Sequence, residues 1–204
     1  MIPHERLDPM QQWIRDGGGR RRLRAVGVAP DDYVLDFGGY RGDGVADLRA
    51  TYDCFVHVFE PVPTFANVIA ARFAGDEKVQ LHRCAVGSTD GTLNLHLSDD
   101  GSGAFVPGRV IEVPVRAAGS LAPELPRDIA VAEINIEGGE FDLIPALESS
   151  GLLPRIRRLF IQFHPISQTS NQDRRTCQAI LSRTHTCDWN YPFVWESWSR
   201  KPQP

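Results

Sequence analysis

The stretch YVLDFGGYRGD, residues 33–43, decides how the rest of the chain is interpreted. It opens with a short apolar, β-prone run that ends on Asp36, and glycines follow at positions 38, 39, 42 and 44. A helical pattern of apolar residues then runs through residues 45–52. A strand, a glycine-rich turn and a helix in this order present backbone N–H groups to a ligand at the edge of a parallel sheet. Position 40 is Tyr, so the spacing is not the strict dinucleotide motif, and the turn alone does not exclude an ordinary loop.

A second apolar run, residues 54–59, ends on an acid, Glu60, and is stopped by Pro61. Glu60 lies 24 residues after Asp36, close to the ~20-residue spacing at which an acid binds the ribose of a nucleoside. A carboxylate is suited to that role because it accepts hydrogen bonds from two vicinal hydroxyls at once. The alternative is a solvated acid at the end of a strand. The glycine-rich turn one strand earlier favours the ribose role.

From residue 31 onward strand-like and helix-like segments alternate, which predicts a mostly parallel sheet covered by helices. In the helix that Pro63 starts, Phe65, Val68, Ile69 and Phe73 are expected to face inward. In the N-terminal segment, residues 7, 10, 13 and 14 have the spacing of one helical face. The strands are expected at about 33–37, 54–59, 79–81, 92–97, 110–115, 129–136 and 158–164, with an aromatic β-prone segment at 189–198.

The most polar strand end is predicted at residues 133–137, where strict alternation would place Glu133, Asn135 and Glu137 on one face. Three polar side chains at the end of a central strand are costly unless they contact a ligand, a metal or solvent. His164 closes the next strand, so it is expected at the same sheet edge. Open α/β sheets build their sites at this edge, beyond the carboxyl ends of the strands.

Six motifs in order carry a resemblance to a known family. DFGGYRGD at 36–43, FEP at 59–61 and CAVG at 84–87 resemble the first motifs of S-adenosylmethionine-dependent methyltransferases. INIEGGEF at 134–141, IQFHP at 161–165 and FVWESW at 193–198 follow, and together the six look like the FkbM family of O-methyltransferases. The resemblance covers residues 31–200. It implies a Rossmann-like class I methyltransferase fold of the α/β class, with a mostly parallel seven-stranded sheet, helices on both faces and a C-terminal antiparallel hairpin.

The resemblance also implies where the methyl donor binds. Two positions depart from the family pattern, because Glu133 stands where a lysine is usual and Asn135 where an aspartate is usual; an amide at 135 cannot act as a base. Glu137, Gly138 and Glu140 match the pattern. The implied residues for S-adenosylmethionine are Asp36, Gly38, Gly39, Tyr40, Arg41, Gly42, Asp43, Glu60, Pro61, Cys84, Ala85 and Asn135.

For catalysis the expected base is His164 first, because an imidazole titrates near neutral pH, and Glu137 second. Alternatively, both residues hold a divalent cation such as Mg²⁺ that lowers the pKa of the acceptor hydroxyl, although Mg²⁺ prefers oxygen ligands. The acceptor is expected to be a sugar, an oligosaccharide or a related natural product. Its expected contacts are Ser102 in the loop 98–109, Glu140, and Trp195 as a stacking surface, with a hairpin tip and core packing as the alternatives for Ser102 and Trp195.

The arginine run at residues 20–24 is either an anion site, for instance for the methionine carboxylate of the donor, or a solvated basic turn.

Length and composition predict a single domain. Within it we expect an N-terminal helical segment at 1–30, and the resemblance implies a methyltransferase domain at 31–204. The net charge of −4 argues against a protein that binds nucleic acid by bulk electrostatics. The four cysteines form no metal or redox motif, and there is neither a signal core nor an apolar run of membrane-spanning length, so the expected location is cytoplasmic. A homodimer is a further expectation. Two other functions stay open: a nucleoside-binding module without turnover and a nicotinamide-dependent oxidoreductase.

Overall fold

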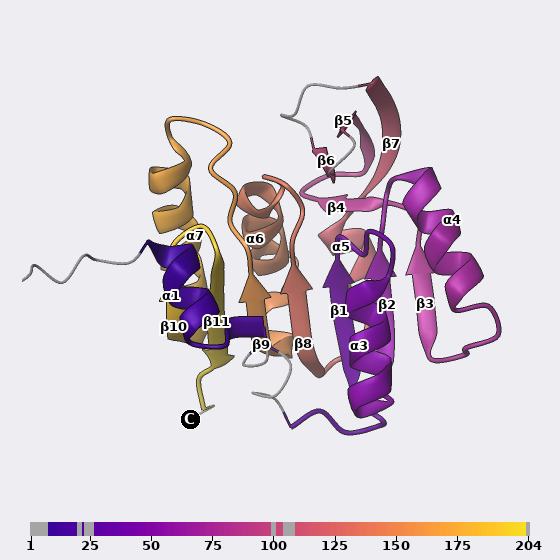
Figure 1. The fold of residues 1–204 in the computed structure, drawn as a ribbon, viewed down its shortest axis with the longest axis horizontal. Helices are drawn as coiled ribbons and strands as arrows, with labels where there is room; N and C mark the ends of the chain where they lie inside the picture. Colours follow the sequence, from indigo (N-terminus) through magenta and orange to yellow (C-terminus); the bar gives the residue numbers. More distant parts are fainter. Residues whose placement is uncertain (1–7, 20–21, 23–26, 99–100, 104–108, 203–204) are drawn as a thin grey trace, which may run out of the picture.

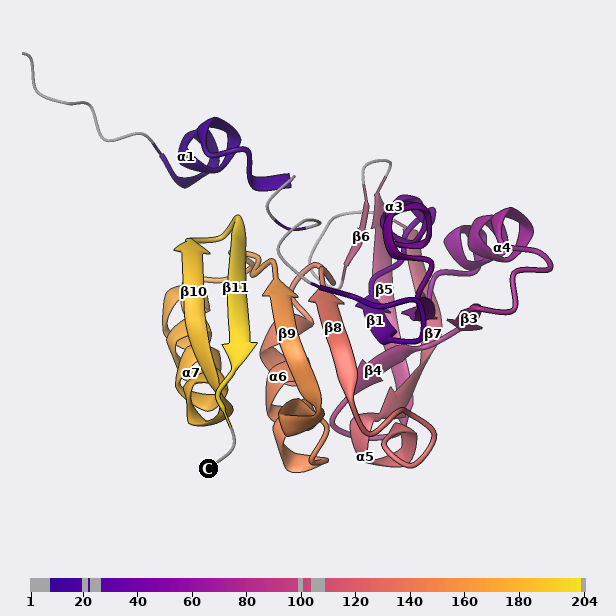
Figure 2. The same cartoon turned by 90° about the horizontal axis from the view of Figure 1, so that it is seen from below.

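The computed structural model describes residues 8–19, 22, 27–98, 101–103 and 109–202. These residues form three layers in which a seven-stranded sheet separates two layers of helices (Figures 1 and 2). The strands of this sheet are β1 (Tyr33–Phe37), β2 (Phe55–Phe59), β3 (Val79–His82), β8 (Ile129–Ile134), β9 (Ile156–Ile161), β10 (His185–Tyr191) and β11 (Trp195–Arg200).

The strand order is β10-β11-β9-β8-β1-β2-β3. Strands β9, β8, β1, β2 and β3 pair in parallel, whereas β11 runs antiparallel to both β9 and β10. The predicted mostly parallel sheet with a C-terminal antiparallel hairpin is therefore confirmed. Because the parallel strands end at one edge, the loops after β1, β2, β8 and β9 meet there, as Figure 1 shows.

Helices α1 (Pro9–Arg15), α3 (Asp43–Tyr52) and α4 (Pro63–Arg72) cover one face of the sheet, and α5 (Ala118–Leu121), α6 (Glu140–Ser149) and α7 (Ser170–Thr184) cover the other (Figure 2). A short 3-10 helix, Leu153–Arg155, precedes β9. Each face has its own apolar core, one joining β-strand residues to α3 and α4 and one joining them to α5, α6 and α7. Within the described ranges, no helix is long and apolar enough to cross a lipid bilayer.

Several predicted details are wrong at the edges of these elements. Val68 is 44% exposed, because α4 lies over the edge strand β3 and buries only Ala66 and Ile69. In α1 only Trp13 is buried, against Trp189 and Tyr191, while Met10 and Ile14 are exposed; Leu7 lies outside the described residues. Strand β8 ends at Ile134 and β9 at Ile161, two and three residues earlier than predicted.

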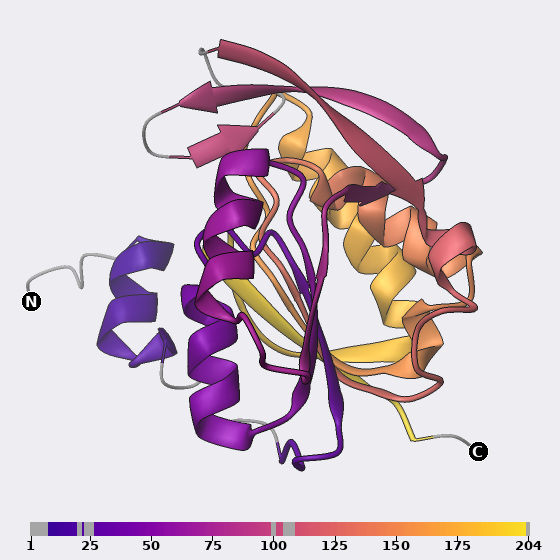
Figure 3. The ribbon, with the colours of Figure 1, turned by 90° about the vertical axis from the view of Figure 1, so that its right-hand side faces the viewer.

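A second, four-stranded sheet lies over the carboxyl ends of β1 and β2 (Figures 1 and 3). It consists of β4 (Ala85–Gly87), β5 (Gly91–Ser98), β6 (Gly101–Gly103) and β7 (Arg109–Ala117), in the order β4-β7-β5-β6. The sequence predicts two of these strands, at 92–97 and 110–115, but it does not predict that they belong to a separate sheet. Strand β6 falls inside the predicted loop 98–109, and only its pairing with β5 makes it a strand.

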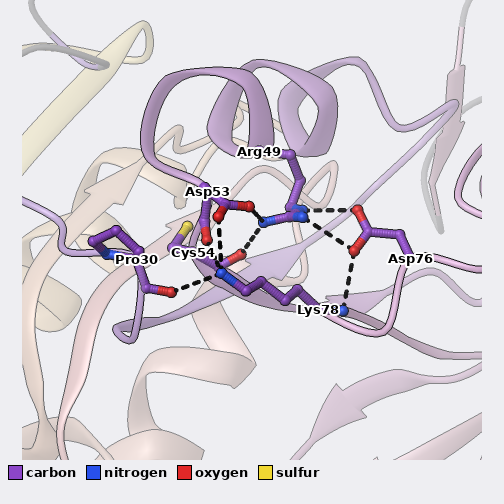
Figure 4. A network of polar contacts seen from close by, with 6 residues as sticks. All are labelled: Pro30, Arg49, Asp53, Cys54, Asp76 and Lys78. Carbon is purple, nitrogen blue, oxygen red and sulfur yellow. Dashed lines mark hydrogen bonds and ion pairs between the residues drawn. The ribbon is translucent and has the colours of Figure 1, made fainter.

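A polar network fastens the opposite, amino-terminal edge of the main sheet (Figure 4). Arg49, on α3, donates to both carboxylate oxygens of Asp76, to Asp53 and to the carbonyl of Cys54, at 2.7 to 3.1 Å. Lys78 donates to the carbonyl and the carboxylate of Asp53. The network joins the end of α3 and the start of β2 to the loop before β3.

Candidate active site

The candidate site is a cleft of about 620 Å³ between the carboxyl ends of β1, β2 and β8 and the second sheet. Its floor is formed by the loops that follow those three strands, including Gly38, Glu60 and residues 135–139. Its other wall comes from the turn between β4 and β5 and from the strands β5 and β7. A volume of this size suits a small ligand rather than a single ordered water.

The glycine-rich turn brings the backbone close to the floor of the cleft. Gly38 has a φ of +96° and donates its N–H to the carbonyl of Phe59 at 3.0 Å. A Cβ at Gly38 would lie 2.1 Å from the carbonyl oxygen of Asn135, so only glycine lets the ends of β1 and β8 approach this closely. Gly42, at φ +80°, then begins α3.

Glu60 is held inside the cleft rather than in solvent. Its residue is 4% exposed, and its two carboxylate oxygens each accept a backbone N–H at 2.8 Å, one from Tyr40 and one from Val62. Burial raises the pKa of Glu60 to about 7, although the two N–H donors act in the opposite direction. The acid thus bridges the turn after β1 and the loop after β2, as a ligand of vicinal hydroxyls would require.

The segment after β8 contributes amide and acid groups. The N–H of Asn135 donates to the carbonyl of Phe37 at 3.0 Å, which fixes Asn135 beside the glycine turn. Its side-chain Oδ1 is buried and has no hydrogen-bond partner in the part of the chain that the structure describes. Glu137 adopts a φ of +51° and its side chain is 44% exposed. Asp142, in the first turn of α6, accepts the N–H of Ser88 at 3.1 Å and ties the second sheet to this edge.

His164 lies behind Glu137 and does not line the cleft. Its Nε2 is 3.5 Å from Oε1 of Glu137, and its Nδ1 is 2.7 Å from Oε1 of Glu140. Burial by itself lowers the pKa of His164, but the hydrogen bond to Glu140 and the two nearby negative charges outweigh it, so the net pKa is raised. Glu140 is fully buried, also accepts the N–H of Ile136, and keeps its Oε2 without a partner.

A second group of charges lies beside the cleft but is not part of its lining. Asp36 pairs in register with Glu133 across β1 and β8, and Arg22 donates to Glu133 at 2.6 Å. Burial, with the neighbouring charge of Glu133, raises the pKa of Asp36 to about 8. Of the predicted arginine run, Arg22 is thus a partner of Glu133, and residues 20, 21, 23 and 24 lie outside the described residues.

The predicted face of three polar side chains at 133, 135 and 137 is wrong. Strand β8 ends at Ile134, and the left-handed backbone at Glu137 stops any alternation. Glu133 pairs with Arg22, and only Asn135 and Glu137 line the cleft.

Some predicted residues are brought to the cleft and others are not. Those that line it are Gly38, Tyr40, Glu60, Pro61, Ala85, Asn135 and Glu137. Those outside its lining are Asp36, Gly39, Arg41, Gly42, Asp43, Cys84, Glu140, His164 and Trp195. Ser102 lies in β6 opposite Leu97 of β5.

Two predicted roles are hard to reconcile with these positions. Trp195 is 8% exposed and packed in the core beneath the guanidinium of Arg22, whose Cζ lies 4.5 Å from the ring centroid. It offers no free face on which a sugar ring could stack. Asp43 is exposed and pairs with Arg72 on α4 at 2.5 Å, outside the cleft.

Few sequence signals indicate the cleft wall that the second sheet supplies. Leucine alternation marks Leu93 and Leu95 as strand residues, but it does not say that both line a cleft. Asp142 follows the motif at 134–141 and has no pattern of its own. The missed lining residues are Phe37, Phe59, Phe65, Val86, Gly87, Ser88, Thr89, Gly91, Thr92, Leu93, Leu95, Val115, Ile136, Gly138, Gly139 and Asp142.

Metal ligands do not gather at this edge. Across the described part of the chain, no group of three or more His, Cys, Asp or Glu residues is arranged to hold a metal ion. The Nδ1 of His164 is hydrogen-bonded to Glu140, so the Glu137–His164 pair offers only Nε2 and the Glu137 carboxylate as ligands.

Comparison with solved structures identifies the fold. A Clostridium thermocellum protein assigned as an rRNA methylase superposes with a TM-score of 0.60 at 10% identity, covering 92% of this chain and 96% of its own. A Streptococcus mutans protein assigned as a methyltransferase, solved with S-adenosylhomocysteine (SAH), gives 0.54 at 10% identity, covering 91% and 97%. The chain has the class I methyltransferase fold.

The O-methyltransferase segment of StiE, residues 942–1257, gives a TM-score of 0.50 at 11% identity and covers 92% of this chain and 57% of its own. No protein-family model matches the sequence, and no curated protein does. At such identities the likeness concerns the fold, so the chemistry must be argued from the cleft itself.

Proposed function

We propose that this chain transfers a methyl group from S-adenosylmethionine to a hydroxyl oxygen of a sugar, an oligosaccharide or a related natural product. The observation that carries the proposal is Glu60, an acid buried in the cleft at the end of β2, with the glycine-rich turn of β1 beside it. This pairing is the arrangement by which parallel α/β sheets hold the ribose of a nucleoside.

The cleft offers the groups that such a donor needs. Glu60 would accept from the ribose hydroxyls, and the close backbone approach at Gly38 leaves room for the donor above the ends of β1 and β8. The buried Oδ1 of Asn135 has no hydrogen-bond partner among the described residues, so an N–H group of the ligand would satisfy it. Membership of the FkbM family is part of this proposal and is supported by the order of the six sequence motifs.

In the mechanism that we propose, Glu137 is the base and His164 is a positioning residue. The donor supplies a methyl group already activated on a positively charged sulfur. The acceptor oxygen forms a bond to the methyl carbon, the electron pair of the carbon–sulfur bond stays on sulfur, and the hydroxyl proton passes to the Glu137 carboxylate. His164 touches Glu137 from behind and is itself held by Glu140, which fixes the direction of the base. We assign no metal to this step.

The charges of the cleft bear on the acceptor. Its lining includes the carboxylates of Glu60, Glu137 and Asp142 and, among the described residues, no lysine, arginine or histidine. Such a lining repels phosphates, which nucleic-acid enzymes neutralise with basic side chains. Although several similar structures are named rRNA methylases or methyltransferases, we therefore propose a small, uncharged acceptor rather than RNA.

The first test is a comparison of ligands by thermal unfolding. S-adenosylmethionine or SAH at 100 times its dissociation constant should add about 2.7 kcal/mol to the free energy of unfolding, whereas NAD should add nothing. Stabilisation by NAD alone would favour the oxidoreductase. The second test is transfer of a labelled methyl group to a panel of oligosaccharides and to RNA. Donor binding without transfer to any acceptor would favour the binding module without turnover.

A further inference from the structure

Tyr40 occupies a backbone conformation that a bulky side chain seldom adopts. Its φ is +47°, in the left-handed region, where glycine, asparagine and aspartate are favoured and an aromatic residue is strained by about 1–2 kcal/mol. The hydrogen bond that this turn needs, from the Tyr40 N–H to Glu60, would be made equally well by glycine or asparagine. The turn does not require the ring, so the ring must be explained by what it does in the cleft.

The ring of Tyr40 is packed against neighbouring side chains but remains partly exposed in the cleft. It meets Phe65, in the first turn of α4, with the ring centroids 4.5 Å apart and the planes at 62°. The guanidinium carbon of Arg41 lies 5.2 Å from the Tyr40 centroid. The residue nevertheless stays 39% exposed and lines the cleft. An immobilised aromatic ring loses little conformational freedom when a ligand packs on it.

Phe65 joins this ring to an apolar wall on the side of the second sheet. Phe65 packs against a small core of Val62, Leu95 and Val113, and it lines the cleft together with Tyr40. Leu93, two residues before Leu95 on β5, also lines the cleft and is 38% exposed. Three separate chain segments thus converge to present apolar surface to the cleft. Isolated exposed apolar residues need no explanation, but a set gathered in one cleft does.

We infer that the rings of Tyr40 and Phe65 form an acceptor platform. The acceptor contains a neutral ring, and the apolar face formed by its C–H bonds packs against this platform. The inference rests on the proposed function and deepens it. Pyranose rings that lack a hydroxyl, such as 6-deoxyhexosides, have the required chemistry: a C–H face for the aromatic rings and hydroxyls for Glu137. The platform takes the role that the sequence led us to expect of Trp195.

The experiment compares Tyr40→Asn and Tyr40→Phe with wild type. Asparagine keeps the backbone N–H and tolerates the left-handed conformation, so Tyr40→Asn removes the ring without disturbing the turn. Val68→Ala is the matched control, because it removes an exposed apolar side chain from the same helix as Phe65 but outside the cleft. Unfolding temperatures at or above the wild-type value show that each variant is folded.

Two affinities are measured for every variant. Calorimetry gives the dissociation constant of SAH, and saturation-transfer NMR of the SAH-saturated protein gives the affinity for methyl 6-deoxyhexopyranosides and methyl hexopyranosides. We expect Tyr40→Asn to weaken glycoside binding at least about 10-fold, as loss of one buried aromatic contact should, with SAH affinity changed less than about 3-fold. Tyr40→Phe and Val68→Ala should behave as wild type.

The outcomes separate this inference from the proposed function. If the wild type binds no SAH, the proposed function itself fails. If SAH binds to the wild type but Tyr40→Asn weakens SAH binding as much as it weakens glycoside binding, the Tyr40 ring contacts the donor and the platform is overturned. The platform is also overturned if Tyr40→Asn binds the glycosides as tightly as wild type does, or if none of these glycosides shows saturation transfer from the SAH-bound wild type.

Discussion

The Nδ1 atom of His164 lies 2.7 Å from Oε1 of Glu140, a carboxylate with no exposed surface. Because a buried carboxylate without a cationic neighbour is costly, the pair favours a protonated His164. A protonated imidazole is a poor base but a good hydrogen-bond donor toward Glu137. This relationship is why we assign proton abstraction to Glu137 and a positioning role to His164.

Glu140→Gln should lower the pKa of His164, because it removes a negative charge that raises this pKa and leaves at most a weaker hydrogen bond to a neutral amide. The measurement is a pH titration of the His164 ring signals by NMR in wild type and variant. An unchanged or higher imidazole pKa in Glu140→Gln would contradict the arrangement. The exposed Glu77→Gln serves as a control for charge removal elsewhere on the surface.

Glu137→Gln should reduce kcat for methyl transfer by about 10²–10⁴-fold, the usual contribution of a general base. The donor dissociation constant should stay near the wild-type value, since the change is isosteric and Glu60 is untouched. Single-turnover assays with labelled donor measure the first quantity and calorimetry measures the second. A variant with wild-type turnover would remove Glu137 from the role of base.

Glu60→Gln should raise the dissociation constant of S-adenosylmethionine about 10- to 100-fold, because hydrogen bonds to a charged group contribute about 1.5–3 kcal/mol. Burial raises the pKa of Glu60 to about 7, so donor affinity should increase as the pH rises through that value and the carboxylate ionises. In Glu60→Gln this component of the pH dependence should disappear. The exposed Glu77→Gln is the matched control and should bind donor as wild type does.

Stability should fall as the pH rises toward alkaline values. Burial raises the pKa of Asp36 from 3.8 to about 8, so between these pH values the folded chain holds a proton that the unfolded chain has lost. The folded state is therefore favoured at the acidic end of the window, and this contribution disappears as the pH passes through about 8. Urea unfolding of the wild type at several pH values should show that the free energy of unfolding falls by more than about 1.4 kcal/mol across this window, the equivalent of one pKa unit. Asp36→Asn should show a clearly smaller loss, and an equal one would refute the assignment to Asp36.

Glu196→Gln should destabilise the fold by about 3–5 kcal/mol, because it leaves the buried guanidinium of Arg174 without its counter-charge. Arg174 reaches from α7 to Glu196 on β11 through its Nε at 2.6 Å and its Nη2 at 2.5 Å. Replacing both residues with methionine should cost less than Glu196→Gln alone. Denaturant unfolding measures both, and the exposed Glu112→Gln should change stability by no more than about 0.5 kcal/mol.

Local sequence patterns were enough to predict that the glycine turn and Glu60 lie at the same edge of the sheet. The glycine turn, Glu60 and the central strands depend on residues close in sequence, and their positions follow from the rule that parallel strands end at one edge. The positions of Trp195 and Asp142 depend on long-range packing, which alternation and helical spacing do not encode. For the same reason the sequence indicated strands at 92–97 and 110–115 without indicating that they form their own sheet. The single-domain organisation and the homodimer stay predictions.

The chain enters the second sheet at β4 and leaves it at β7, and these two strands are neighbours. Strand β4 begins three residues after β3, β7 leads directly into α5, and the two are paired in parallel, with Ala85 opposite Val115 and Gly87 opposite Ala117. Its two ends therefore lie on neighbouring strands, and such strands are about 4.8 Å apart. Residues 85–117 form a cassette that can be exchanged between proteins of this fold without moving β1 and β2, at whose ends we propose that the donor binds. Under that proposal, acceptor choice can change during evolution while donor binding stays constant.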